Sequence, residues 1–306
     1  MDTEMKVNHK GRINIVLQDR VEQNPYITNG NKVSTNKYFK GIDESFSSFV
    51  AIDEVKTTIK QIYASYIINE KRKELGIQES QQVLHMLFKG NPGTGKTTVA
   101  RRLAKLYFDL GILSKGQFVE VERADLVGEY IGQTAQKTRS VIQKAMGGIL
   151  FIDEAYSLAR GGEKDFGKEA IDTLVKYLED SRDDIVIILA GYPSEMRRFL
   201  MMNPGLESRF PFMLDFADYK LDELMEIAKI MVSEREYRFS REAEIKLKNH
   251  LKEKLAIHQI NFSNARYIRN IIEQAIRMQA FRLVQADNYQ LDQLIELTAD
   301  DILQEE

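Results

Sequence analysis

Residues 90–97 have the spacing of a phosphate-binding loop. They read GNPGTGKT and match the pattern G-x-x-x-x-G-K-[ST] at every fixed position. Glycines let backbone N–H groups converge on phosphate oxygens without obstruction by a Cβ atom. Lys96 supplies a full positive charge for the β- and γ-phosphates, and the Thr97 hydroxyl is suited to bind Mg²⁺. The pattern therefore predicts a site for ATP and Mg²⁺. The residues expected to contact the nucleotide are Asn91, Pro92, Gly93, Thr94, Gly95, Lys96, Thr97 and Thr98.

Two adjacent carboxylates follow an apolar segment further along the chain. Residues 148–152 read GILFI and are followed directly by Asp153 and Glu154. An apolar strand that ends in one acid is common, but a second acid together with a preceding phosphate loop is a specific combination. Asp153 is expected to join the Mg²⁺ shell, while Glu154 orients and deprotonates the attacking water. The chemistry indicated is ATP hydrolysis, with Lys96 and Glu154 as catalytic residues.

Short apolar runs alternate with amphipathic stretches around these motifs, and this alternation must position them. The expected strands span 83–89, 118–122, 148–153, 185–190 and 212–216. The helices expected between them include 97–109, 134–145 and 168–180. Such alternation predicts an α/β fold, with a parallel sheet covered by helices on both faces. Ligands of these sheets bind at the carboxyl ends of the strands, where the phosphate loop and the two acids both fall.

The pattern changes to helices after residue 217. Helical periodicity covers 221–234, 241–257 and 264–284, another helix is expected from residue 299, and no strand-like run interrupts them. Ser240 is a candidate cap for the second of these helices. The expected parts are an N-terminal arm over 1–44, a nucleotide-binding domain over 45–217 and a small helical domain over 218–306. The arm is rich in turn-forming residues and is either a tail without a partner or a docking segment.

Composition argues against several classes of function. The 306 residues carry a net charge of −3, so no overall basic field attracts nucleic acid or an anionic membrane. The absence of cysteine excludes disulfides, thiol nucleophiles and Cys-ligated metal sites. The longest strongly apolar stretch, 185–190, is far shorter than the ~20 residues of a membrane-spanning helix, and the N-terminus is unlike a secretion signal. We therefore expect a cytoplasmic protein with neither a nucleic-acid nor a membrane partner.

Five segments carry a resemblance to a known family. They read GNPGTGKT, ILFIDEAYSL, LVGEYIGQT, NPGLESRF and NARYIRN. With these motifs the chain resembles the AAA+ ATPases, and more narrowly the group of the red-type Rubisco activases and the stage V sporulation K proteins. The resemblance implies a P-loop AAA+ large domain followed by a helical lid domain. It also implies a homo-oligomer, in this family a hexameric ring with each nucleotide between neighbouring subunits, and a role in spore development.

Two arginines gain a catalytic role from this resemblance. Arg209 matches the arginine finger that completes the site of the neighbouring subunit. A planar guanidinium suits this role because it stabilises charge on the phosphoryl group in transfer. Arg266 matches the lid arginine that senses the γ-phosphate within its own subunit.

The resemblance also assigns the segment that contacts adenine and the position of a residue near the attacking water. Val50 and Ile52 match the segment that contacts adenine, although Ala51 stands where most members have glycine. Tyr192 stands where most members place a polar residue that holds the attacking water. We therefore give Tyr192 no catalytic role.

A short loop is expected to contact the substrate. Tyr130, Ile131 and Gly132 match the aromatic–apolar–glycine loop that lines the central pore of these rings, and an apolar tip can grip any peptide. Residues 160–165 are a candidate second pore-facing loop. The resemblance thus implies a ring that remodels a protein substrate of unknown identity. The alternatives are a nucleotide-controlled assembly scaffold with slow ATP hydrolysis and a DNA-directed loader, against which the acidic balance argues.

Overall fold

The computed structural model describes residues 38–78, 82–130, 132–161, 165–257, 262–286 and 289–302. The chain divides into two units, Met1–Lys37 and Tyr38–Glu306, and all described residues belong to the second. Most of the arm expected over 1–44 therefore lies outside the described residues. Helix α1 (Lys40–Ser45) lies within the described unit and packs against α2 (Asp53–Glu74), and its residue Ile42 is fully buried.

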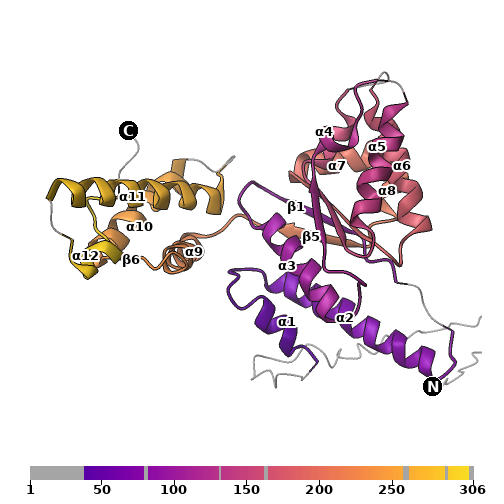
Figure 1. Cartoon of the computed structure of the whole chain (residues 1–306), viewed down its shortest axis with the longest axis horizontal. Coiled ribbons are helices and arrows are strands. Elements are labelled where there is room, and N and C mark those ends of the chain that lie inside the picture. The colour runs from indigo at the N-terminus through magenta and orange to yellow at the C-terminus, as the bar shows by residue number, and fades with distance from the viewer. Residues whose placement is uncertain are drawn as a thin grey trace, which may run out of the picture. The chain divides into compact units, whose positions relative to one another are not determined.

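Five parallel strands form the central sheet (Figure 1). They are β1 (Met86–Gly90), β2 (Phe118–Val121), β3 (Ile149–Ile152), β4 (Val186–Gly191) and β5 (Phe212–Phe216). Their order across the sheet is β2-β3-β4-β1-β5. Strands β3 and β4 are buried along their whole length, as expected for a parallel sheet that is covered on both faces. The α/β fold predicted from the alternation of apolar runs is confirmed.

Helices cover both faces of this sheet and enclose two cores. One core contains residues of α1, α2 and α3 (Lys96–Asp109). The other contains residues of α4 (Arg123–Leu126), α5 (Gln133–Ala145), η1 (Ala155–Ala159), α6 (Gly167–Asp180), α7 (Pro193–Met202) and α8 (Pro204–Glu207). Successive side chains of β3 alternate between the cores, because Leu150 and Ile152 belong to the second and Ile149 and Phe151 to the first.

A helical domain with its own core follows β5. It contains α9 (Leu221–Ser233), α10 (Arg241–Ile257), α11 (Asn264–Ala286) and α12 (Leu291–Ile295). The three long helices were expected at close to these bounds, and the Ser240 hydroxyl accepts a hydrogen bond from the Ala243 N–H at the start of α10, as predicted. Two expectations are wrong. Two-residue strands, β6 (Arg238–Phe239) and β7 (Glu296–Leu297), do interrupt the helices, and residues 299–302 form a turn.

The carboxylate of Asp301 explains why this last segment is not helical. Asp301 is almost completely buried and accepts hydrogen bonds from both the N–H and the hydroxyl of Thr298, at 2.8 and 2.9 Å. It also forms a two-pronged ion pair with Arg282 of α11. These contacts close a turn and attach it to α11.

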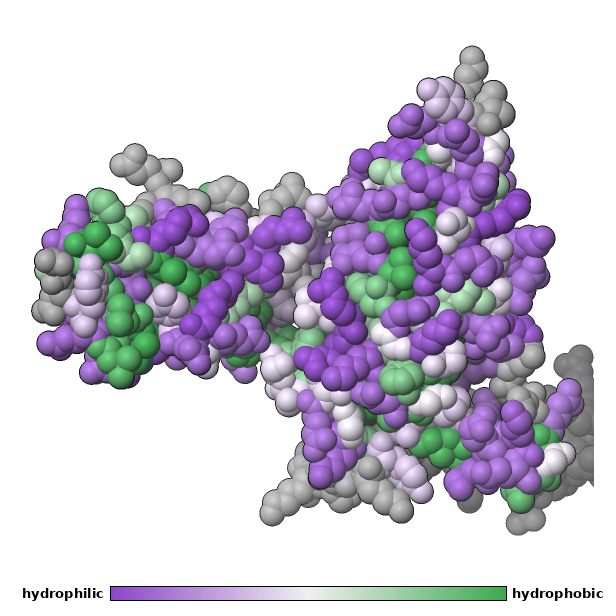
Figure 2. All heavy atoms as spheres, viewed as in Figure 1, coloured by the Kyte–Doolittle hydropathy of each residue, from purple (hydrophilic) through white to green (hydrophobic). Residues whose placement is uncertain are grey.

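The face of the described unit shown in Figure 2 is mainly hydrophilic. One apolar area on it lies over α12, where Leu291 and Leu294 are exposed.

A buried histidine ties the sheet to α6. His85 Nε2 lies 3.1 Å from the Leu178 carbonyl oxygen, and His85 Nδ1 accepts the Ile187 N–H at 3.1 Å. A neutral ring with its proton on Nε2 satisfies both contacts, whereas a proton on Nδ1 removes the second. Burial accordingly lowers the pKa of His85 from 6.5 to about 4.

This histidine is expected to make stability depend on pH. The unfolded chain binds the proton below about pH 6.5, but the folded chain binds it only below about pH 4. The His85 contribution to the free energy of unfolding should therefore fall by about 3 kcal/mol as the pH is lowered through this window. Urea unfolding at several pH values would measure it. His85→Gln should show a flatter dependence, and equal slopes in the two proteins would contradict the assignment.

Candidate functional site

The phosphate-binding loop connects β1 to α3. Strand β1 ends at Gly90 and α3 begins at Lys96, so the loop opens at the carboxyl end of the sheet, as expected. Two of its glycines are required by the backbone, because Gly93 and Gly95 have φ values of 71° and 93°. A Cβ atom on Gly93 would also lie 2.1 Å from the Ser263 carbonyl oxygen. The close approach of residue 263 places the helical domain directly against this loop.

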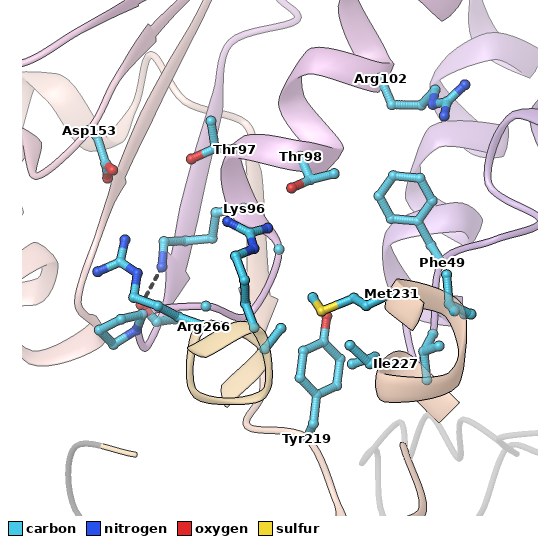
Figure 3. Close-up of a pocket in the computed structure, with 18 of the residues that line it drawn as sticks. Phe49, Lys96, Thr97, Thr98, Arg102, Asp153, Tyr219, Ile227, Met231 and Arg266 are labelled. Carbon is cyan, nitrogen blue, oxygen red and sulfur yellow. Dashed lines mark hydrogen bonds between the residues drawn. The ribbon is translucent and has the colours of Figure 1, made fainter. Parts of the chain in front are cut away.

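A cavity of about 420 Å³ lies between the loop and the helical domain (Figure 3). The expected site residues that line it are Val50, Pro92, Gly93, Gly95, Lys96, Thr97, Thr98, Asp153, Glu154 and Arg266. The fold thus brings together the loop, both acids and an arginine of α11. The other predicted nucleotide-contact residues, Ile52, Asn91 and Thr94, are not among the residues that line the cavity. The Thr94 hydroxyl donates to the Asn91 carbonyl oxygen at 2.8 Å.

Lys96 lies at the end of the cavity that is formed by the loop of residues 90–97. Its ammonium donates hydrogen bonds to the carbonyl oxygens of Gly90 and Asn91, each at 2.8 Å. Burial and the nearby Arg266 guanidinium lower the Lys96 pKa, and the carboxylates of Asp153 and Asp218 oppose this shift. A partly desolvated ammonium beside a second cation is stabilised by an added anion. The charge distribution therefore favours phosphate at this end.

The acid pair lies at the tip of β3. The Asp153 N–H donates to the Val121 carbonyl oxygen at 3.0 Å, and the Asp153 carboxylate accepts the Glu154 N–H at 2.9 Å. Glu154 has a φ of 45°, a left-handed conformation that is strained for a residue with a side chain. Mg²⁺ commonly takes only one or two protein ligands beside phosphate oxygens and water. Thr97 and Asp153, which both line the cavity, fit this requirement.

The opposite end of the cavity is apolar. Figure 3 shows Phe49, Ile227 and Met231 at this end, with Arg102 beside Phe49. Val50 and Ile230 also line the cavity. An apolar slot of this kind suits a nucleobase. Of these residues, only Val50 was predicted from the sequence to contact the nucleotide. Ile227, Ile230 and Met231 of α9 were missed, because their spacing is that of any helix that faces a core.

The chain entering this slot is strained. Ala51 has a φ of 54°, a conformation that glycine adopts freely and alanine does not. This requirement explains why the family pattern has glycine there. Tyr192 lines the cavity beside Gly191, with its ring 5.9 Å from that of Tyr156. Its position offers an aromatic wall where most family members have a polar side chain.

Arg209 lies outside the lining of this cavity. It follows α8, donates a hydrogen bond to the Gly205 carbonyl oxygen and forms an ion pair with Glu179. Its action on a neighbouring subunit stays a prediction.

Tyr130 lies in a loop whose two ends are fixed by hydrogen bonds. The loop between α4 and α5 is held where the Gly128 N–H donates to the Thr134 hydroxyl and where the Thr138 hydroxyl donates to the Leu126 carbonyl oxygen, both at 3.0 Å. Tyr130 itself is 67% exposed. Gly132, with a φ of 83°, begins the turn into α5, while Ile131 lies outside the described residues.

The second candidate loop, 160–165, is anchored at its described end. Asp165 accepts hydrogen bonds from the N–H groups of Gly161 and Gly167 and forms an ion pair with Arg123. Arg123 also donates to the Ser157 carbonyl oxygen at 2.7 Å. Residues 162–164 lie outside the described part of the chain.

The described ranges also bear on metal binding and membrane insertion. Within them, no group of three or more His, Cys, Asp or Glu side chains is arranged to hold a metal ion. No helix in the same ranges is both long and apolar enough to cross a membrane.

Known proteins and family models match nearly all of the described chain. Residues 86–216 match the family model described as "ATPase family associated with various cellular activities (AAA)", and residues 220–306 match the AAA lid domain. "Stage V sporulation protein K" of Bacillus subtilis (strain 168) is 54% identical over 96% of this chain and 94% of its own length. "Protein CfxQ" of Xanthobacter flavus is 46% identical over 78% of this chain and 74% of its own length. The chloroplastic "Ribulose bisphosphate carboxylase/oxygenase activase" of Cyanidioschyzon merolae is 43% identical over 86% of this chain and 90% of its own length.

Proposed function

The chain belongs to the AAA+ ATPases and hydrolyses ATP, and from this premise we propose that it forms a ring that remodels a protein substrate during bacterial sporulation. The family membership rests on matches to both the ATPase domain and its lid. The sporulation setting is supported by the 54% identity to a protein named for that process. We also propose a cytoplasmic location, in line with the expectation from composition.

The cavity suggests how its residues divide the chemistry. Lys96 would bind the β- and γ-phosphates, and Thr97 and Asp153 would hold Mg²⁺, which neutralises phosphate charge. Glu154 would orient the attacking water and take its proton. Arg266 would reach the γ-phosphate from the lid, and Arg209 would do so from the neighbouring subunit. This last role requires a homo-oligomer, proposed here to be a hexamer.

Apolar surface on the lid supports assembly. Phe281 and Val284 of α11 are 59% and 67% exposed, and Leu291 of α12 is 74% exposed. Exposed apolar side chains grouped on neighbouring helices are typical of surfaces that meet another protein. A second copy of the chain is the partner that a ring requires.

One observation carries the remodelling proposal. Tyr130 presents a large, exposed aromatic ring from a loop whose base is fixed by hydrogen bonds. Such a tip can contact many peptides through ring area, and it would move as a unit with helices α4 and α5, which hold it.

Replacing Tyr130 with alanine tests this proposal. The change removes the ring but leaves Lys96, Asp153 and Glu154 in place, so ATP binding and basal hydrolysis should persist. Stimulation of hydrolysis by an unfolded protein such as casein should be lost. Tyr130→Phe should keep most of the stimulation, because the hydroxyl adds little ring area.

Steady-state ATPase rates with and without casein are the measurement. Tyr289→Ala is a matched control, because Tyr289 is 53% exposed on the lid. Should wild type respond to casein and Tyr130→Ala respond equally, the loop is not the gripping element and a scaffold becomes the better explanation.

A further inference from the structure

One carboxylate joins the phosphate-binding loop to the lid. Asp218 lies between β5 and α9, where the chain passes from the large domain into the lid. The side-chain amide of Asn91 donates to both Asp218 carboxylate oxygens, at 3.0 and 2.9 Å. The amide of Asn264, the first residue of α11, donates to the same carboxylate at 2.7 Å. Two amides from distant parts of the chain therefore share one acid.

Asn264 is built into this junction. It is fully buried and has a φ of 48°, a conformation that asparagine tolerates better than most residues. Its Nδ2 also lies 3.3 Å from the Pro92 carbonyl oxygen, and its Oδ1 accepts the Tyr219 N–H at 3.0 Å. The amide has two N–H donors and one acceptor oxygen. Its N–H groups donate most closely to Asp218 and to the Phe262 carbonyl oxygen at 3.0 Å, and Pro92 is a longer third contact.

Further contacts join the same two parts of the molecule. The Ala265 N–H donates to the Gly93 carbonyl oxygen at 3.1 Å. The Tyr219 hydroxyl donates to the Thr94 carbonyl oxygen at 3.0 Å. Every residue from 91 to 94 is thus in contact with residues 218–265. Arg266, which lines the cavity, follows directly after these contacts.

We propose that Asp218 is a positioning residue for ATP hydrolysis: it holds Asn264 against Asn91 and thereby fixes Arg266 where the γ-phosphate binds. The inference rests on the γ-phosphate role proposed for Arg266. Asp218, Asn91 and Asn264 are not among the residues that line the cavity, so they act by holding the lid and not by touching the nucleotide.

Asp218→Ala tests this inference because loss of the charge and loss of positioning predict opposite changes in nucleotide affinity. Asp218 carries a negative charge close enough to influence Lys96, so loss of charge alone would tighten the binding of any nucleotide. Loss of positioning instead weakens binding of nucleotides that have a γ-phosphate. We expect affinity for the β,γ-imido analogue of ATP to fall about tenfold, and affinity for ADP to change much less.

Calorimetric titration of the full chain with each nucleotide and Mg²⁺ is the measurement. The variants are Asp218→Ala, Arg266→Ala and the double variant, and Asp222→Ala is the control. Asp222 is an exposed acid of the same region that pairs with Lys248 and not with the loop. Asp218→Asn, which keeps the size and one acceptor oxygen, should be intermediate.

The double variant decides how Asp218 acts. If Asp218 works through Arg266, the double variant should bind the analogue about as weakly as Arg266→Ala alone. Additive losses, an equal loss of ADP affinity, or tighter binding of both nucleotides would each overturn the inference. A wild-type ratio of analogue to ADP affinity in Arg266→Ala would instead refute the proposed role of Arg266.

Discussion

Replacing Glu154 with glutamine is expected to slow ATP hydrolysis by at least about a hundredfold while ATP still binds. Glu154 lines the cavity directly after Asp153, and an amide of the same shape cannot take a proton from water. Phosphate release under saturating ATP measures the rate, and calorimetry measures the affinity. A near wild-type rate in Glu154→Gln would show that another group activates the water.

Lys96→Ala is the companion variant, with the opposite defect. It removes the one full positive charge of residues 90–97, so nucleotide binding itself should be lost. The two variants together separate binding from chemistry. Retained affinity in Lys96→Ala would mean that the phosphates lie elsewhere in the cavity.

The second large effect is expected at Arg209. Arg209→Ala should reduce turnover by about a thousandfold, the effect typical of removing an arginine finger. Mixing Arg209→Ala subunits with Glu154→Gln subunits should restore part of the activity. Some mixed interfaces then combine an intact Glu154 from one subunit with an intact Arg209 from its neighbour.

Rates measured across a series of mixing ratios test this complementation. Arg101→Ala serves as a control, because Arg101 is an exposed arginine of the same domain that pairs with Glu120. Activity that equals the sum of the two inactive proteins at every ratio, or an active species that is a monomer by light scattering, would contradict action in trans.

The sequence predicted the sheet and the acid–phosphate centre because both depend on local patterns. Strand β3 is an apolar run directly followed by Asp153, and the loop before α3 is a contiguous motif. Contiguous patterns of this kind report directly on strand ends and helix starts, where such sites form. The expected bounds of these elements agree closely with the structure.

The junction around Asp218 could not be predicted in the same way. The Asn264 amide and the Pro92 carbonyl oxygen are 172 residues apart in sequence, and no local pattern connects them. The apolar end of the cavity was missed for a related reason, since Ile227 looks like any core-facing residue of α9. The expected helix from residue 299 failed because a buried acid can close a turn as well as begin a helix, and only its partner Arg282 decides between them.

The position of β1 in the sheet also affects how the chain can fold. Although β1 is the first strand in sequence, its neighbours are β4 and β5, so each of its pairings spans about 100 residues or more. At about 5–20 residues per second, a chain under synthesis would carry this apolar strand without a partner for on the order of ten seconds. The loop that binds phosphate is attached to the same strand. Nucleotide bound at this loop is therefore expected to stabilise the protein only after β4 and β5 have been made.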